Sequence, residues 1–270
     1  MPAMKTPAWK ITKLLLIILI CFSILGCGIE EMKIDEEDMV GNVSIIDIYD
    51  NIEFDPRFKV DFGFGCVIKL GRETILFDSG SDSKVLLENL KLAGIKPKEI
   101  NIVVLSHEHQ DHTGGILGFL EKNPSIKIYV PESFSPYLKN EIASKGAEII
   151  EVSKPIKITK GVYSTGQLGS LVKEQSLVIN SKKGLIIVTG CAHPGITNIV
   201  KKAKELFKKE PYLVIGGFHH PPISVVEEFR KLNVKKVAPS HCSGSEIMEA
   251  FERTYQKDFI KSGVGKIIKI

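Results

Sequence analysis

The chain has 270 residues, and its few cysteines do not form a disulfide pattern. The five cysteines are Cys21, Cys27, Cys66, Cys191 and Cys242, and none forms a Cys-x-x-Cys pair. Cys21 lies in an N-terminal apolar segment and Cys27 lies at its end. Three cysteines, an odd number, remain in the body of the chain. An odd count without paired spacing argues against a disulfide framework.

The body of the chain also lacks a basic excess. The whole sequence has 36 basic and 32 acidic residues, a net charge of +4. Lys5, Lys10 and Lys13 lie in residues 1–26, which contain no acid, so 33 basic and 32 acidic residues remain (36 − 3 against 32). We therefore expect no nucleic-acid partner. The sequence has no internal repeat, no low-complexity tract and no glycine motif of the flavin- or dinucleotide-binding type.

The N-terminal segment predicts export. Three lysines precede Leu14–Leu25, which is apolar apart from Ser23. A charged region followed by a short apolar run is typical of a secretory signal, and the run is shorter than the roughly 20 residues of a membrane-spanning helix. The alternative is an uncleaved N-terminal anchor.

The end of this segment, Gly26-Cys27, resembles the lipidation site of bacterial lipoproteins, although Leu25 is larger than the residue usually found there. The resemblance implies a signal peptide at residues 1–26, a lipidated Cys27 and a membrane-attached protein on the exported side. We interpret residues 27–43 as an acidic, solvated tether and residues 44–270 as the folded domain.

Four potential metal ligands follow a single apolar run. Ile102–Leu105 predicts a buried strand, and Gly114-Gly115 predicts a turn. The potential ligands between them are His107, His109, Asp111 and His112. Imidazole and carboxylate groups suit Zn²⁺, Mn²⁺ or Fe. A loop at the end of a strand can direct them to one point, which a strand with alternating side chains cannot do.

Every histidine of the chain follows directly on a predicted strand. The remaining four are His193, His219, His220 and His241, and the seven together occupy four loops. Loops at one end of a sheet carry sites because the sheet positions them. The pattern therefore predicts one shared site.

The spacing H-x-H-x-D-H resembles the signature of the metallo-β-lactamase superfamily. The resemblance implies an α+β fold, a four-layer αββα sandwich over about residues 44–270, and a centre with two divalent metal ions, Zn first and Mn or Fe as alternatives. His107, His109 and His193 would hold one ion, and Asp111, His112 and His241 the second. A water bound there has a pKa of about 7 and is a nucleophile at neutral pH.

The sequence departs from the family pattern at two places. Gln167 lies where many members have a histidine, and Cys191 lies where many have a bridging aspartate, so His193 is expected to replace the missing histidine. Cys191 either bridges the metals, binds one of them, or is a plain thiol.

Asp78 either supports the metal loop or forms an Asx-turn. Asp111 is expected to orient the nucleophile. His219 binds substrate, donates a proton or supports a ligand, whereas His220 is expected to be exposed and structural.

The pattern of apolar runs also predicts the order of the elements. Strands are expected first, followed by alternating strands and helices. Ala147–Val152, Ile156–Ile158 and Gly161–Ser164 are predicted to belong to a second sheet.

Three classes of function remain open. The motifs around Cys191, His219 and His241 are similar to those of dihydropterin ribofuranosylaminobenzene phosphate synthase-like proteins, a branch of the superfamily. We favour a hydrolase that uses a metal-bound hydroxide on an ester, phosphodiester, phosphate or lactam bond of a small molecule. The alternative is a metal-dependent synthase, whose phosphosugar pocket would need basic residues; candidates are Lys173, Lys182 and Lys183. A redox or non-catalytic metal protein comes third.

Substitution of Cys27 tests the lipoprotein interpretation. Cys27→Met in the full chain should release the protein to a soluble fraction or stop processing, because the lipid-accepting thiol is gone. Cell fractionation and intact mass measure both effects. Unchanged membrane attachment together with unchanged mass would contradict lipidation.

Overall fold

The computed structural model describes residues 38–270. The predicted signal at residues 1–26, Cys27 and most of the predicted tether lie outside the described residues. Within 38–270, no helix has both the length and the apolar character required to cross a membrane. Export and lipidation therefore stay predictions.

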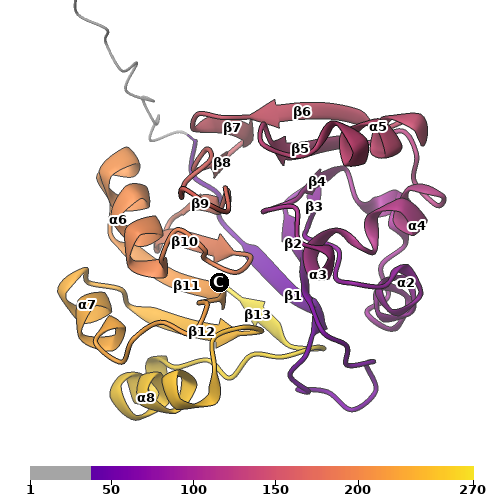
Figure 1. Cartoon of the computed structure of the whole chain (residues 1–270). Coiled ribbons are helices and arrows are strands. Elements are labelled where there is room, and N and C mark those ends of the chain that lie inside the picture. The colour runs from indigo at the N-terminus through magenta and orange to yellow at the C-terminus, as the bar shows by residue number, and fades with distance from the viewer. Residues whose placement is uncertain (1–37) are drawn as a thin grey trace, which may run out of the picture. The chain divides into compact units, whose positions relative to one another are not determined.

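Seven strands form the first sheet, in the spatial order β13-β1-β2-β3-β4-β5-β6 (Figure 1). In chain order they are β1 (Val43–Asp50), β2 (Phe64–Leu70), β3 (Glu73–Phe77), β4 (Ile102–Val104), β5 (Lys127–Pro131), β6 (Glu148–Val152) and β13 (Ile267–Lys269). β13, β1, β2 and β3 pair antiparallel, whereas β3 to β6 pair parallel. Because β3 and β4 are parallel, the residues that follow them emerge at the same edge of the sheet.

Six strands form the second sheet, in the order β12-β11-β10-β9-β8-β7. They are β7 (Ile156–Thr159), β8 (Val162–Ser164), β9 (Leu177–Ser181), β10 (Gly184–Thr189), β11 (Pro211–Gly217) and β12 (Lys236–Ser240). β10, β11 and β12 are parallel, and the other pairs are antiparallel. The three parallel strands therefore deliver their following loops to one edge.

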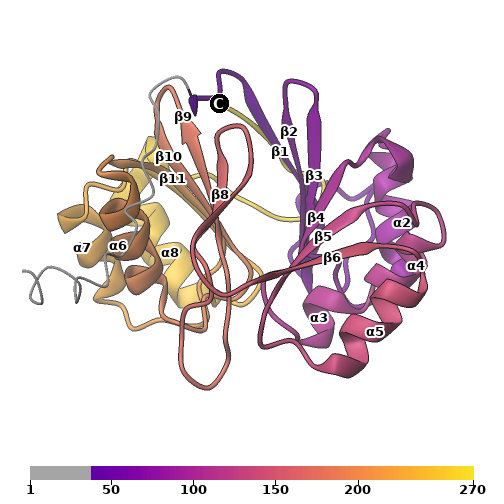
Figure 2. The ribbon, with the colours of Figure 1, turned by 90° about the horizontal axis from the view of Figure 1, so that it is seen from above.

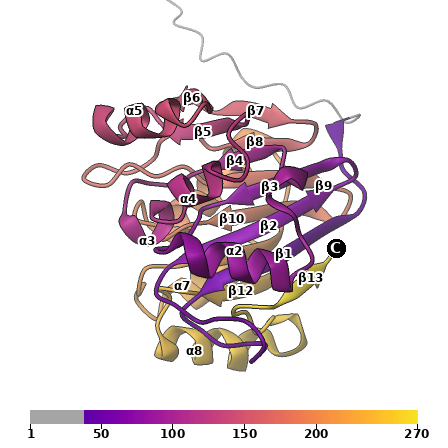
Figure 3. The same ribbon diagram turned by 90° about the vertical axis from the view of Figure 1, so that its right-hand side faces the viewer.

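Helices cover the outer face of each sheet, as Figure 2 shows for both sides and Figure 3 shows for the first sheet. The helices on the first sheet are α2 (Ser83–Leu92), α4 (Ile116–Leu120) and α5 (Pro136–Ser144), and those on the second are α6 (Ile196–Phe207), α7 (Val225–Lys231) and α8 (Ser245–Tyr255). Three short turns complete the list: η2 (Pro97–Glu99), α3 (Gln110–Thr113) and η3 (Gln256–Asp258). The predicted four-layer αββα sandwich is confirmed.

Two apolar layers hold the first sheet in place. Each strand contributes to both layers, because successive side chains of a strand point to opposite faces. In β4, Ile102 and Val104 pack between the two sheets, whereas Val103 packs against the helices. The same alternation in β2 places Ile68 between the sheets and Val67 under the helices. Both faces are buried, which explains why β4 reads as an uninterrupted apolar run.

The prediction that placed one strand in the second sheet was wrong. Ala147–Val152 was expected in the second sheet, but β6 is the edge strand of the first sheet and pairs parallel with β5. α5 connects the two strands, and a strand-helix-strand unit returns its second strand to the same sheet. The chain crosses to the second sheet only afterwards, between β6 and β7.

The last residues of the predicted tether lie against the domain. The Asp38 side chain accepts hydrogen bonds from Tyr163 and from Lys157, whose Nζ is 2.8 Å away. The backbone N–H of Val40 donates to the carbonyl of Asn180 over 2.9 Å. Residues 38 and 40, which the sequence assigned to the tether, therefore contact the domain.

Candidate metal centre

The loop after β4 places its three histidines differently. His107 and His112 are fully buried, whereas His109 is exposed and lies just before α3. The His109 carbonyl accepts the backbone N–H groups of His112 and Thr113, so the short turn begins directly after the second histidine. α3, which contains Asp111 and His112, lies at the lower edge of the sheets in Figure 2, where the hairpin between β8 and β9 also projects.

The first group of potential ligands contains His107, His109 and His193, whose ligand atoms lie within 4.8 Å of one another. Nε2 of His107 is 3.1 Å from Nδ1 of His109. The ring of His193 lies 4.7 Å from that of His107 and 4.8 Å from that of His109. The loop after β10 therefore brings His193 across from the second sheet to the pair on the first sheet.

The second group contains Asp111, His112, Cys191 and His241, also within 4.8 Å of one another. Oδ2 of Asp111 lies 3.5 Å from Nε2 of His112 and 3.3 Å from Nε2 of His241. Sγ of Cys191 lies 3.2 Å from Nε2 of His112. All seven predicted metal ligands are thus found in two adjoining groups at one edge of the sandwich.

Hydrogen bonds behind the site orient three of the imidazole rings. Nδ1 of His112 is 2.7 Å from Oδ2 of Asp78, and Nδ1 of His241 is 2.7 Å from Oδ1 of Asn51. Nδ1 of His107 lies 2.9 Å from the Ser106 hydroxyl, whose own proton is donated to Asp78. Each Nδ1 therefore carries a proton, and each Nε2 faces the ligand groups.

Asp78 supports the metal loop, as one of the two interpretations of its sequence position proposed. It is fully buried and accepts hydrogen bonds from the Ser106 backbone N–H at 2.6 Å and from the Ser106 hydroxyl at 2.7 Å. Together with His112, these contacts join the ends of β3 and β4. A buried carboxylate with three donors is an ionic support rather than a surface turn.

One buried atom supports the fit of a cation to these groups. Nε2 of His193 is buried without a hydrogen-bond partner. An unsatisfied buried polar atom is costly, and a bound cation would give its lone pair a partner. The donor set of imidazole, carboxylate and thiol is suited to Zn²⁺.

The electrostatic environment prepares most of these groups for a cation. Burial and the neighbouring imidazoles lower the pKa of His107 far below its usual value, and burial together with His219 lowers the pKa of His193 to about 4. Burial alone would raise the pKa of Asp111, but hydrogen bonds from His112 and His241 outweigh it and lower that pKa strongly. Neutral imidazoles and an ionised carboxylate are the forms that bind metal.

His112 is one exception, and Cys191, whose pKa is raised by the hydrogen bond to Cys242 and by burial, is another. Burial alone would lower the pKa of His112, but Asp78 and Asp111 raise it to about 10. A cation at the second group therefore has to displace a proton from His112.

Glu174 is a functional candidate that the sequence did not reveal. It is 1% exposed, and its carboxylate accepts the backbone N–H groups of Cys191, Ala192 and His193 at 3.0, 2.8 and 2.7 Å. Burial raises its pKa to about 7. Glu174 lies in the hairpin between β8 and β9 without any spacing motif, so only the fold identifies it as the support of the Cys191–His193 turn.

Cys242 is a second unpredicted candidate. Its Sγ is 3.2 Å from Sγ of Cys191, and these two thiols form a third group of potential ligands with His219. The hydrogen bond between the sulfurs raises the pKa of Cys191 and lowers that of Cys242. The sequence placed Cys242 next to His241 but gave no sign of its contact with Cys191.

His219 lies beside the first ligand group, and Gln167 bonds to a neighbouring loop. His219 is exposed, and its ring is 4.2 Å from that of His193, at the open side of the first group. Its neighbour His220 is also exposed. The side chain of Gln167 accepts a hydrogen bond from the Ser133 backbone N–H.

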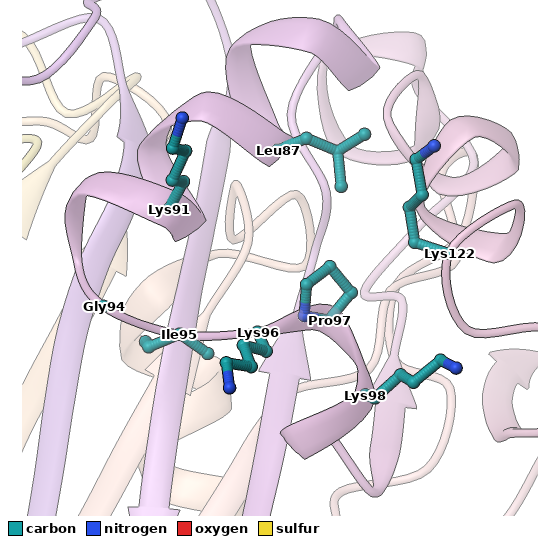
Figure 4. A pocket seen from close by; sticks show the side chains of 8 residues that line it. All are labelled: Leu87, Lys91, Gly94, Ile95, Lys96, Pro97, Lys98 and Lys122. Atoms are coloured by element: carbon teal, nitrogen blue, oxygen red, sulfur yellow. The ribbon is translucent and has the colours of Figure 1, made fainter.

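A separate cavity of about 650 Å³ lies on the other side of the first sheet, around the end of α2 (Figure 4). Its lining consists of Leu87, Lys91, Gly94, Ile95, Lys96, Pro97, Lys98 and Lys122. No predicted ligand is among these residues. The cavity is therefore distinct from the metal centre.

Glu174→Gln is expected to weaken metal binding about 10- to 100-fold, the usual loss when a group that supports ligands is altered. The amide nitrogen of glutamine would face backbone N–H donors and loosen the Cys191–His193 turn. Titration against a chelator of known affinity measures the effect, with the exposed Glu252→Gln as the matched control. Equal affinity in both variants would contradict the supporting role.

Sequence comparison agrees with the fold. The family model described as the metallo-beta-lactamase superfamily matches residues 60–234. The 7,8-dihydropterin-6-methyl-4-(beta-D-ribofuranosyl)-aminobenzene-5'-phosphate synthase of Methanocaldococcus jannaschii is 30% identical over 289 positions, covering 85% of this chain and 98% of that protein. Ribonuclease Z of the same organism is 30% identical over 174 positions, covering 62% of this chain and 49% of that enzyme.

Solved structures share the fold. The crystal structure of a metal-dependent hydrolase of the beta-lactamase superfamily has a TM-score of 0.72 at 24% identity and covers 84% of this chain and 99% of its own. The short form of human tRNase Z has a TM-score of 0.60 at 14% identity and covers 83% of this chain and 98% of its own. With its family-model match and its αββα fold, this chain belongs to the metallo-β-lactamase superfamily.

Proposed function

We propose that this chain is a metal-dependent hydrolase with two divalent cations, acting on an ester, phosphodiester, phosphate or lactam bond of a small molecule. The observation that supports it most is the pair of adjoining ligand groups, each with inward-facing nitrogen atoms and each supported from behind. Cations held in these groups would activate water for attack and polarise the bond to be broken.

Each residue of the centre has a distinct task in this proposal. His107, His109 and His193 hold one cation, and Asp111, His112, Cys191 and His241 hold the second. The side chain of Asp111 is 18% exposed, whereas that of His112 is fully covered. Asp111 can therefore contact both a cation of the second group and solvent, and its carboxylate would orient a water for attack.

His219 is proposed to contact the substrate. It is exposed beside His193, and it adopts a positive φ of 55°, which is uncommon for a residue other than glycine. Backbone strain of this kind often occurs at functional sites. An imidazole in this position can donate a proton to the leaving group.

A synthase activity is the second candidate, and the similarity to the Methanocaldococcus jannaschii synthase is the observation that favours it. The basic residues that such an activity would need do not gather at the centre. Lys182 and Lys183 lie in the turn before β10, whereas Cys191 follows the opposite end of that strand. Lys173 is in the hairpin that contains Glu174, where its Nζ donates to the Gly169 carbonyl. We therefore rank hydrolysis first.

The metal content of the full chain tests the binuclear centre. The wild type should contain about two metal ions and Asp111→Ala about one, because the mutation removes the carboxylate of the second group. Asp55→Ala, a surface substitution outside the site, serves as the control. Elemental analysis after purification measures the stoichiometry, and one ion or none in the wild type would contradict the proposal.

The same preparations test hydrolysis with a set of phosphodiesters, phosphomonoesters and lactones. We expect turnover that a chelator abolishes. His219→Ala should lower kcat by about 10²- to 10⁴-fold if His219 donates the proton, whereas the adjacent exposed His220→Ala should retain the wild-type kcat. If kcat and KM of His219→Ala equal those of the wild type, the proposed role of His219 is wrong.

A further inference from the structure

The two thiols beside the metal centre come from loops that are distant in sequence. Cys191 follows β10 and Cys242 follows β12, and their Sγ atoms lie 3.2 Å apart. Both sulfurs lie within 4.8 Å of a ring nitrogen of His219, which follows β11. Three successive parallel strands of the second sheet therefore each deliver one soft or borderline donor to the same point.

The glycine at the end of β11 makes this approach possible. A Cβ atom added at Gly217 would lie 2.7 Å from Sγ of Cys242 and 3.2 Å from Cα of Cys191. The same Cβ would lie 2.4 Å from the Gly190 carbonyl oxygen, so a side chain here would clash both with the loop after β10 and with the sulfur of Cys242. Gly217 thus keeps the space that the sulfur of Cys242 fills.

Two thiols and one imidazole form a donor set of known chemistry. Cys₂His with one open position is a zinc ligand set, and thiolates select soft and borderline cations. Cys242 is partly exposed and His219 is exposed, so a cation can reach the group from solvent. Binding would release the thiol protons to solvent, because thiolates are the ligand form of cysteine.

We propose that Cys191, His219 and Cys242 form a third cation site, specific for soft or borderline divalent cations, whose occupation inhibits the enzyme. The proposal rests on the hydrolase function proposed above, because it uses two groups of that centre. A cation bound here takes up His219 and draws Cys191 away from the second ligand group. Binding of the third ion would therefore lower the turnover of the enzyme.

Cadmium binding to the full chain, kept reduced, tests the site directly. Equilibrium dialysis should give about three Cd²⁺ per chain for the wild type and about two for Cys242→Ser. The near-ultraviolet absorption of sulfur-to-cadmium charge transfer should fall in Cys242→Ser. Cys66→Ala, which removes a fully buried thiol that belongs to none of the ligand groups, should match the wild type in both measurements.

Inhibition provides the second measurement. The Cd²⁺ concentration for half-inhibition is taken relative to the uninhibited rate of each variant. In Cys242→Ser it should be at least ~10-fold higher than in the wild type, because even substitutions of groups that only support metal ligands weaken binding by this factor. Two Cd²⁺ in both the wild type and Cys242→Ser, with unchanged charge-transfer absorption, would overturn the third site and leave the binuclear proposal intact. An Asp111→Ala variant that loses no metal would instead contradict the binuclear centre itself.

Discussion

The buried carboxylate of Asp78 is the contact on which the geometry of the centre depends most. It lies at the end of β3 and binds Ser106 and His112, which follow the adjacent strand β4. A fully buried carboxylate requires hydrogen-bond donors, and the metal loop supplies them. The same bonds fix the ring of His112 and, through the Ser106 hydroxyl, the ring of His107. The hydrogen bonds to this one buried carboxylate therefore orient ligands of both groups.

The same principle operates on the other loops. Glu174 closes the Cys191–His193 turn through three backbone N–H groups, and Asn51 orients His241. Each loop that carries ligands is thus tied to a polar group from a different part of the chain. Without such supports, side chains at loop ends would sample many rotamers, and the entropy cost of ordering them would oppose metal binding. Preorganisation of this kind is what holds the potential ligands of two sheets together at one edge.

Much of the fold and most of the ligands could be predicted because their signals are local. Apolar runs such as Ile102–Leu105 identify strands, and the spacing of His107, His109 and His112 is visible along the chain. The sheet of β6 could not be predicted, because the residues of Ala147–Val152 suit either sheet and only the crossover through α5 decides between them. Glu174 and Cys242 were missed for a related reason: each acts through a partner far away in the sequence.

The sequence by itself determined that seven histidines follow apolar strands, that four potential ligands lie in one loop, and that the pattern is that of a metal-binding α+β domain. Only the tertiary structure decided which loops meet. It placed Cys191 between His112 and Cys242, and it turned Glu174 from an ordinary loop acid into a buried support. The physical reason is that periodicity and spacing report local conformation, whereas distances between loops depend on the pairing of strands and the packing of two sheets.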